Sequence, residues 1–401
     1  MEIIKKNFKT LLVVGIVLQV FISIITYHPD IRAFVLASKF INQGEVFTFY
    51  DHVSKLPSGD KIKQIYGDDI FIYPPLAYLI PAFFYAPFSG FLSTPYEEII
   101  YNDSAIYTRN AYYPAFLIFK LPFILASLLI LFLLPKFFDK IEHGQLAQLF
   151  WLFSPVNLLV SSGMGQVDVI LALFLLTAFF YIKKHSFPAA SIFIALSALI
   201  KPVGLALLPL IAISAYRKNG LRNAILSILP GVTAWVVLIF PFLLSPAFRM
   251  YALFAAHTAK TTYAGIAISG AVSIPWFFIF YSLIALYLFE EKITLIKGLG
   301  LATLSVLAFN HFHPQWFLWF MPFLIIYSIS KNKLFLFFTL TISWVLIWLS
   351  FDPSLHAGMI LSFKESLPPT LASPISASSL VLLARAYLAA SLVYLLQVKD
   401  D

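Results

Sequence analysis

A few ionisable and amide side chains interrupt otherwise apolar stretches of this 401-residue chain. A charge inside a bilayer costs about 2.5 to 3.5 kcal/mol on insertion scales, so a charged residue there needs a partner, an aqueous cavity or a function. Carboxylates suit general-base chemistry, whereas a cation can stabilise a phosphate that gains charge in a reaction. The residues in question are Asp30, Gln166, Asp168, Lys201, His311, His313 and Asp352.

The composition indicates that membrane helices position these residues. Hydrophobic residues make up 60% of the chain and charged residues only 11%, against about 25% in a soluble domain, which excludes an ordinary soluble protein. The absence of Cys excludes disulfides, a thiolate nucleophile and Cys-based metal sites. The net charge of +8 is spread over short loops beside apolar segments, which favours anionic lipid headgroups over nucleic acid as the partner.

A helical span needs about 20 apolar residues, and such stretches recur along the chain. They predict an all-α, polytopic bundle of about 12 spans (about 11 to 13), forming one integral membrane domain over residues 1–401. No small-residue cleavage site follows the first stretch, so we expect a retained span rather than a signal peptide. The expected spans are 8–27, 114–134, 146–162, 166–182, 187–200, 202–216, 221–245, 272–289, 293–310, 314–330, 334–351 and 376–397.

The basic residues predict the orientation of these spans, because cytoplasmic loops are enriched in Lys and Arg. Under one topology the basic clusters all lie inside, and the chemistry-bearing residues all lie outside. The clusters are Lys5/Lys6/Lys9, Lys136/Lys140, Lys183/Lys184, Arg217/Lys218/Arg222, Lys292/Lys297 and Lys331/Lys333.

That topology requires that the apolar stretch 74–92 does not cross the membrane. Pro74, Pro75, Pro81 and Pro87 interrupt this stretch and favour an interfacial or re-entrant segment. The alternative is a crossing, which would move every later loop to the other side. Without a crossing, a large outer first loop runs from 28 to about 113 and contains its own juxtamembrane helices.

Asp30 follows the first expected span by three residues, so its carboxylate is expected at headgroup depth on the outer side. Two interpretations are open: a general base that takes a proton from an acceptor hydroxyl, or an N-cap of a helix over 31–41. Asp168 presents a similar choice. It either occupies a favourable helix N-terminal position or lines a pocket, and the two do not exclude each other.

Several short motifs accompany Asp30 in a fixed order. They are Gly44 with Tyr50, Tyr73-Pro74-Pro75-Leu76, Ser154-Pro155, Gly165-Gln166-Val167-Asp168, Lys201-Pro202 and His311-Phe312-His313-Pro314-Gln315-Trp316. The order, spacing and expected sidedness resemble the GT-C superfamily of integral membrane glycosyltransferases, most closely the polyprenol-phosphate-mannose-dependent mannosyltransferase branch. No single motif is specific, so the resemblance depends on their joint occurrence. It makes residues 1–216 the motif-bearing module and residues 217–401 additional transmembrane helices.

The resemblance implies an enzyme that transfers a sugar, mannose in the closest branch, from a polyprenyl- or dolichyl-phosphate donor to an acceptor hydroxyl with inversion. The acceptor would be a glycan, a glycolipid or a protein. The active site would lie on the extracytoplasmic face of a cell membrane, or of the endoplasmic reticulum membrane in a eukaryote. No cofactor is expected. The alternative is a divalent metal held by the two histidines of the last motif with Asp352 and His356.

Carried over to this sequence, the family pattern makes Asp30 the catalytic base, with Asp69 as the rival base among further acids, Asp51 and Asp68, in the same loop. The substrate pocket would include Tyr73, Pro74, Gln166, Asp168 and Asp69. The donor phosphate would be bound by Lys201, His313, His311, Lys120 and Arg385. For the two lysines and the arginine, snorkelling to the interface is the alternative.

A secondary transporter or lipid flippase is the alternative function, because intramembrane charges and broken helices also mark substrate paths. Such a protein often shows repeated halves, and none is detectable in this sequence. The large asymmetric first loop and the confinement of polar residues to one face favour the enzyme.

The topology makes a direct prediction. A reporter domain fused after Lys184 should behave as cytoplasmic in a protease-protection or enzyme-reporter assay, because the Lys183/Lys184 cluster is expected inside. A reporter found outside would mean that residues 74–92 cross the membrane.

Overall fold

A computed structural model describes residues 2–68, 70–101, 112–254, 264–270, 272–351 and 379–398. Of the described residues, 79% are helical, which confirms the all-α class in its coarse form. A two-stranded antiparallel hairpin, β1 (Gly265–Ser269) and β2 (Val272–Pro275), is the only sheet in the part described. Asp69, Asp352 and His356 lie outside the described residues.

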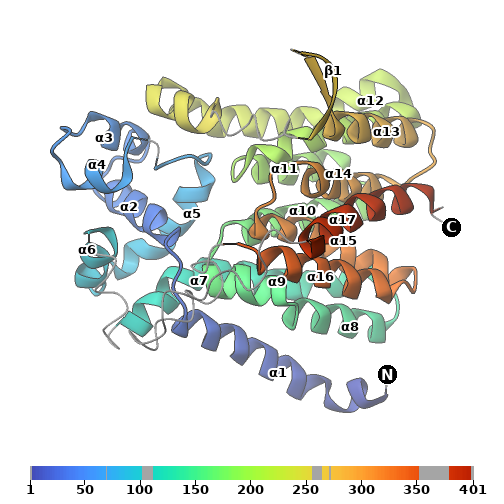
Figure 1. Ribbon diagram of the computed structural model, residues 1–401, viewed down its shortest axis with the longest axis horizontal. Coiled ribbons are helices and arrows are strands. Elements are labelled where there is room, and N and C mark those ends of the chain that lie inside the picture. Colours follow the sequence, from blue (N-terminus) through green and yellow to red (C-terminus); the bar gives the residue numbers. More distant parts are fainter. Residues whose placement is uncertain are drawn as a thin grey trace.

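The predicted outer first loop folds into a lobe of short helices. Figure 1 shows this lobe at one end of the long helices, beyond the C-terminal end of α1 (Glu2–Ile25). The helix predicted over 31–41 is present as α2. The helices of the lobe are α2 (Ile31–Asn42), α3 (Phe49–Lys55), α4 (Lys61–Tyr66), α5 (Leu76–Tyr85) and α6 (Ser93–Tyr101).

The stretch 74–92 is short and packs into this lobe. It forms the 10-residue α5 and a 3-residue turn of 3-10 helix, η1 (Ala86–Phe88), with Pro81 inside the helix. At 1.5 Å per residue these cover about 20 Å, less than the hydrocarbon core of about 30 Å. α5 packs on α2 and α7 (Tyr113–Leu133). Length and packing therefore favour the interfacial or re-entrant placement.

The remaining helices run side by side as a bundle (Figure 1), and each expected span overlaps a helix of the structure, with α1 in the first span and α12 extending over two of them. They are α7, η4 (Leu134–Phe137), α8 (Ile141–Leu152), α9 (Pro155–Asn157), η5 (Leu158–Met164), α10 (Asp168–Lys183), α11 (Phe187–Ala198), η6 (Pro202–Leu207), α12 (Leu208–Ile239), η7 (Phe240–Leu244), η8 (Phe248–Leu253), α13 (Trp276–Phe289), α14 (Leu295–Phe309), η10 (Pro314–Trp316), α15 (Phe317–Ser330), α16 (Leu334–Trp348) and α17 (Ser379–Gln397).

Within the described ranges, four helical segments are long and apolar enough to cross a membrane: Lys6–Ile25, Tyr113–Phe137, Pro202–Leu244 and Ser379–Gln397. A fifth is added if α8 and the α9–η5 segment, bent by 44°, form one span. The chain is thus a membrane protein. The predicted number of spans does not follow from helix length, because α11 has 12 residues and α14 has 15, below the roughly 20 that a span needs.

The longest of these segments, Pro202–Leu244, is two helices rather than one. Asn219 (φ −146°) and Gly220 (φ 76°) are non-helical and divide α12 into a hairpin. Gly220 has the left-handed backbone that glycine adopts without a Cβ clash. The break lies within the basic cluster of Arg217, Lys218 and Arg222, where the sequence places the boundary between two spans.

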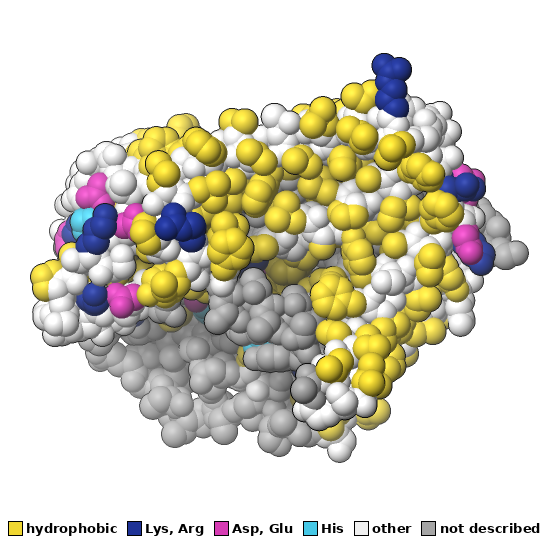
Figure 2. All heavy atoms as spheres, turned by 90° about the horizontal axis from the view of Figure 1, so that it is seen from above, with side chains coloured by type: hydrophobic (Ala, Val, Ile, Leu, Met, Phe, Trp, Pro, Cys, Tyr) yellow, Lys and Arg dark blue, Asp and Glu magenta, His cyan; other side chains and the backbone are white. Residues whose placement is uncertain are grey.

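The exterior of the bundle is apolar between two charged ends. Figure 2 shows hydrophobic side chains covering the broad face that carries α12 and α13, with charged side chains at its left and right ends. On α12, Leu221 and Val237 are 65% and 63% exposed, and Phe278 and Leu286 of α13 are also exposed. Such a band is the surface that the hydrocarbon of a bilayer would cover.

One close backbone contact fixes α11 against the second half of α12. The Gly231 amide donates to Ser191 Oγ at 3.1 Å, and a Cβ on Gly231 would lie 2.4 Å from the carbonyl oxygen of Ser191. We expect Gly231→Ala to separate these helices and lower the free energy of unfolding by about 1 to 3 kcal/mol. Gly90→Ala, where a Cβ would meet nothing within 4 Å, is the matched control. Equal melting temperatures of the two variants in detergent would contradict this account.

Candidate functional site

Segments far apart in the sequence meet where the lobe joins the bundle. The turn after α1 carries Asp30, the turn between η5 and α10 carries Gln166, and the turn before η6 carries Lys201. Gly165 makes the middle turn possible. Its backbone is left-handed (φ 68°), and a Cβ there would lie 2.9 Å from Lys120 Cγ.

The Asp30 carboxylate accepts a hydrogen bond from Gln166 Nε2 at 2.7 Å. Asp30 occupies the N-cap position of α2, but its side chain makes no capping hydrogen bond. The capping interpretation is therefore wrong for this carboxylate. Gln166 is fully buried, whereas the Asp30 side chain is 43% exposed, so a rigid donor orients a carboxylate that remains accessible.

His28 holds Asp30 from the other side, a role that we did not predict from the sequence. Its Nδ1 accepts the Asp30 backbone N–H at 3.2 Å and lies 3.7 Å from Asp30 Oδ1. Burial lowers the pKa of His28 and outweighs the opposing attraction of Asp30. A neutral ring can accept at Nδ1, which places its proton on Nε2. The sequence did contain one indication of this role, since a histidine lies two residues before the candidate base.

A cavity of about 400 Å³ lies beside Asp30 and is lined by Arg32, Tyr66, Tyr73 and Tyr78 among others. Arg32 was not predicted either. Its Nε donates to Tyr66 Oη and to the Ile99 carbonyl, both at 3.1 Å, which fixes a cation on the cavity wall. The cavity thus presents one carboxylate, one guanidinium and several hydroxyl-bearing rings.

Asp168 and Lys201 form a buried ion pair next to this cavity. Lys201 Nζ lies 2.9 Å from both carboxylate oxygens of Asp168, and Trp319 Nε1 donates to Asp168 Oδ1 at 2.7 Å. Asp168 is fully buried and Lys201 is 4% exposed. The snorkelling interpretation of Lys201 is therefore wrong, because its ammonium is buried on Asp168. The predicted N-terminal helix position of Asp168 is confirmed. α10 does begin at Asp168, which also gives the carboxylate the favourable end of the helix dipole.

Tyr73 joins the ion pair to the cavity. The Lys201 ammonium lies 4.7 Å from the centroid of the Tyr73 ring, and the same ring lines the Asp30 cavity. Tyr73 is held by its backbone, which accepts from Tyr50 Oη at 2.7 Å and donates to Tyr78 Oη at 3.2 Å. Burial, and then the charges of Asp30 and Asp168, raise the pKa of Tyr73 well above its usual value. Its hydroxyl therefore stays protonated and can donate to a ligand.

The two histidines lie on the Lys201 side of the site. The ring centroids of His311 and His313 are 4.7 Å apart. The His313 ring lies 5.0 Å from the Trp316 ring, which in turn lies 5.2 Å from the Trp319 ring. This series of rings ends at the tryptophan that donates to Asp168. In the described part of the chain no group of three or more His, Cys, Asp or Glu could hold a metal. Asp352 and His356, named in the metal alternative, are not in that part.

Lys120 and Arg385 were also expected to bind the donor phosphate, and the structure places them in two different surroundings. Lys120 is fully buried, and its ammonium donates to the carbonyl and hydroxyl of Thr26 at 2.5 and 2.7 Å. It therefore braces the end of α1, neither snorkels nor faces the cavity, and would have to leave Thr26 to meet a phosphate. Arg385 is half-buried and donates to the Asn310 carbonyl at 2.7 Å, directly before His311.

Two further acids of the lobe have structural partners. Asp51 is 6% exposed and accepts from Ser245 Oγ at 2.8 Å and the Ala247 amide at 3.1 Å, which ties α3 to the segment after α12. Asp68 pairs with Lys63 at 3.1 Å. Pro74 is buried two residues before α5 begins, so it shapes the turn that carries Tyr73. Asp69, the predicted rival base, lies outside the described residues.

The arrangement provides an accessible, oriented carboxylate beside a polar cavity, next to a neutralised cation surrounded by aromatic rings. A carboxylate held in this way can accept a proton from a hydroxyl that enters the cavity.

No known family model matches the sequence, and no curated protein is significantly similar to it.

The buried pair makes a stability prediction. Lys201→Met should lower the free energy of unfolding by about 3 to 5 kcal/mol, because it leaves the Asp168 carboxylate buried without its cation. The double variant Lys201→Met/Asp168→Leu should recover much of that loss, since no isolated charge remains. Melting temperatures in detergent would test this. Equal stability of the single and double variants would show that the ion pair is not the source of the effect.

Proposed function

We propose that this protein is an integral membrane glycosyltransferase that moves a sugar from a polyprenyl- or dolichyl-phosphate donor to an acceptor hydroxyl. Mannose is the sugar favoured by the motif resemblance. A glycan, glycolipid or protein is the acceptor class. The proposal includes the topology of about 12 spans, with the site on the extracytoplasmic face of the membrane.

The observation that supports the proposal best is the setting of Asp30. Its carboxylate is 43% exposed, accepts from buried Gln166 and faces a cavity of about 400 Å³. A carboxylate that serves only the fold is usually capping or fully paired, as Asp51 and Asp168 are here. Asp30 instead combines fixed orientation with access, which a general base requires.

In the proposed reaction the acceptor hydroxyl oxygen forms a bond to the anomeric carbon and passes its proton to Asp30. The bond from the anomeric carbon to the lipid phosphate breaks, and the phosphate leaves with the electron pair. Attack opposite the leaving phosphate inverts the configuration. Tyr73 and Arg32 stand on the cavity wall to orient the sugar and acceptor hydroxyls.

The donor phosphate is assigned to the side of the site that carries the histidines. Lys201 already neutralises Asp168, so its charge is only partly available to a second anion. Its ammonium also lies within 6.0 Å of the Trp316 ring, which contacts His313. We therefore place the phosphate near His311, His313 and Arg385, with Lys201 adding long-range stabilisation of the leaving charge.

The base assignment has a direct test. Asp30→Asn should lower transfer of mannose from polyprenyl-phosphate-mannose by about 100-fold or more, because the amide cannot take the proton. Donor binding, measured by quenching of tryptophan fluorescence, should change little. Asp68→Asn, which alters an exposed acid of the same lobe, is the matched control and should retain full transfer.

Two outcomes would contradict this account. Undiminished transfer by Asp30→Asn, with loss in Asp69→Asn, would move the base to Asp69. Movement of the lipid across reconstituted vesicles without any sugar transfer would favour a flippase or transporter instead.

A further inference from the structure

A second cavity lies among the basic loops, away from Asp30. Its volume is about 450 Å³, and three segments line it: the α10–α11 turn, the end of the first half of α12, and the α13–α14 turn. These are three of the loops that the positive-inside pattern places together. By composition alone, the cavity should attract an anion, because its lining includes Lys183, Arg217, Lys218 and Lys292.

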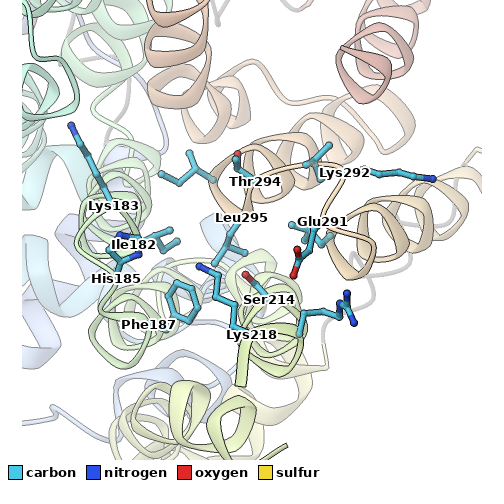
Figure 3. A pocket seen from close by; sticks show the side chains of 14 residues that line it. Ile182, Lys183, His185, Phe187, Ser214, Lys218, Glu291, Lys292, Thr294 and Leu295 are labelled. Atoms are coloured by element: carbon cyan, nitrogen blue, oxygen red, sulfur yellow. The ribbon is translucent and has the colours of Figure 1, made fainter. Parts of the chain in front are cut away.

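Most of these cations point away from the cavity or have partners outside it. Figure 3 shows the side chains of Lys183 and Lys292 extending away from its centre. Lys183 Nζ donates to the Lys136 carbonyl at 3.1 Å, and Lys292 pairs with Glu290. The Arg217 guanidinium lies over the Phe289 ring, 5.1 Å from its centroid.

The groups that remain at the centre carry opposite charges. Figure 3 shows the Lys218 ammonium and the Ser214 hydroxyl turned toward the centre, with the Glu291 carboxylate across from them. Lys218 lies over the Phe187 ring at 5.5 Å. Within the described ranges neither Lys218 nor Glu291 has an ion-pair partner, although they line the same cavity. A ligand with two charges could satisfy both.

Glu291 also occupies an unusual backbone position. It follows α13 with a left-handed backbone (φ 58°), where helices commonly place glycine. A side chain with a Cβ is strained there relative to glycine. His185 and Asn332 have the same backbone after α10 and α15, so this conformation ends the helix and leaves the Glu291 side chain at the cavity.

We propose that this cavity binds the phosphoethanolamine headgroup of a membrane lipid. Lys218 and Ser214 would receive the phosphate, and Glu291 would receive the primary ammonium. The exposed apolar residues Leu221 and Phe289 adjoin two of the loops that line the cavity, so the acyl chains of a lipid can remain in the bilayer while its headgroup enters. This binding is independent of sugar transfer.

The test is a lipid titration of the full chain in detergent, followed by native mass spectrometry. Phosphatidylethanolamine should bind about tenfold more tightly than phosphatidylcholine or phosphatidylglycerol with the same acyl chains. The choline ammonium has no N–H to donate, and glycerol has no cation. Glu291→Gln should remove the preference over phosphatidylcholine, whereas Lys218→Gln should weaken binding of both lipids.

Lys292→Gln is the matched control, because its side chain points away from the cavity and pairs with Glu290. It should bind phosphatidylethanolamine like the unmodified chain. Equal binding of phosphatidylglycerol and phosphatidylethanolamine would overturn the proposal in favour of simple anion attraction. Displacement of the lipid by inorganic phosphate as readily as by glycerophosphoethanolamine would also overturn it, since the cavity would then recognise phosphate alone.

Discussion

The buried Asp168–Lys201 ion pair is the contact on which the polar end of this bundle depends. Two charges removed from water are stable only when geometry and extra hydrogen bonds compensate their desolvation. Here both carboxylate oxygens meet the ammonium, and Trp319 Nε1 adds a donor. The pair thereby links α10, the turn before η6 and α15, and Tyr73 covers it from the lobe. Without it, the wall of the Asp30 cavity would lose its support.

Charged groups have different surroundings at the two ends of the molecule. At the lobe end, Asp51, Asp168 and Lys201 are buried and paired, whereas Asp30 keeps both a fixed orientation and access to solvent. At the other end, three lysines of the loops have partners: Lys183 donates to a carbonyl, Lys292 pairs with an acid and Lys333 donates to Tyr394 Oη. This division leaves a broad apolar exterior between the ends (Figure 2). Asp30, Lys218 and Glu291 are among the charged groups that remain available to ligands.

Local sequence predicts some of this well. The helix after Asp30, the interruption near Gly220 and the helical content of each expected span follow from apolar periodicity, proline and basic clusters, which act over a few residues. The predicted membrane topology put four candidate residues on one face, and the structure does place them in one region: Asp30, Gln166, Asp168 and Lys201. The number of spans is less determined, because helices of 12 to 16 residues can be buried in protein or cross with help from neighbours.

The sequence by itself determined the class of the protein, its helices and the short list of polar residues, because hydrophobicity and charge patterns are properties of neighbouring residues. Only the tertiary structure decided which polar group meets which. In the structure Asp30 bonds to Gln166 and His28, Lys201 pairs with Asp168, and buried Lys120 donates to Thr26. These pairings join residues up to 136 positions apart, and burial makes each one strong or costly according to its partner. No local pattern encodes that choice, since it depends on how the helix ends pack.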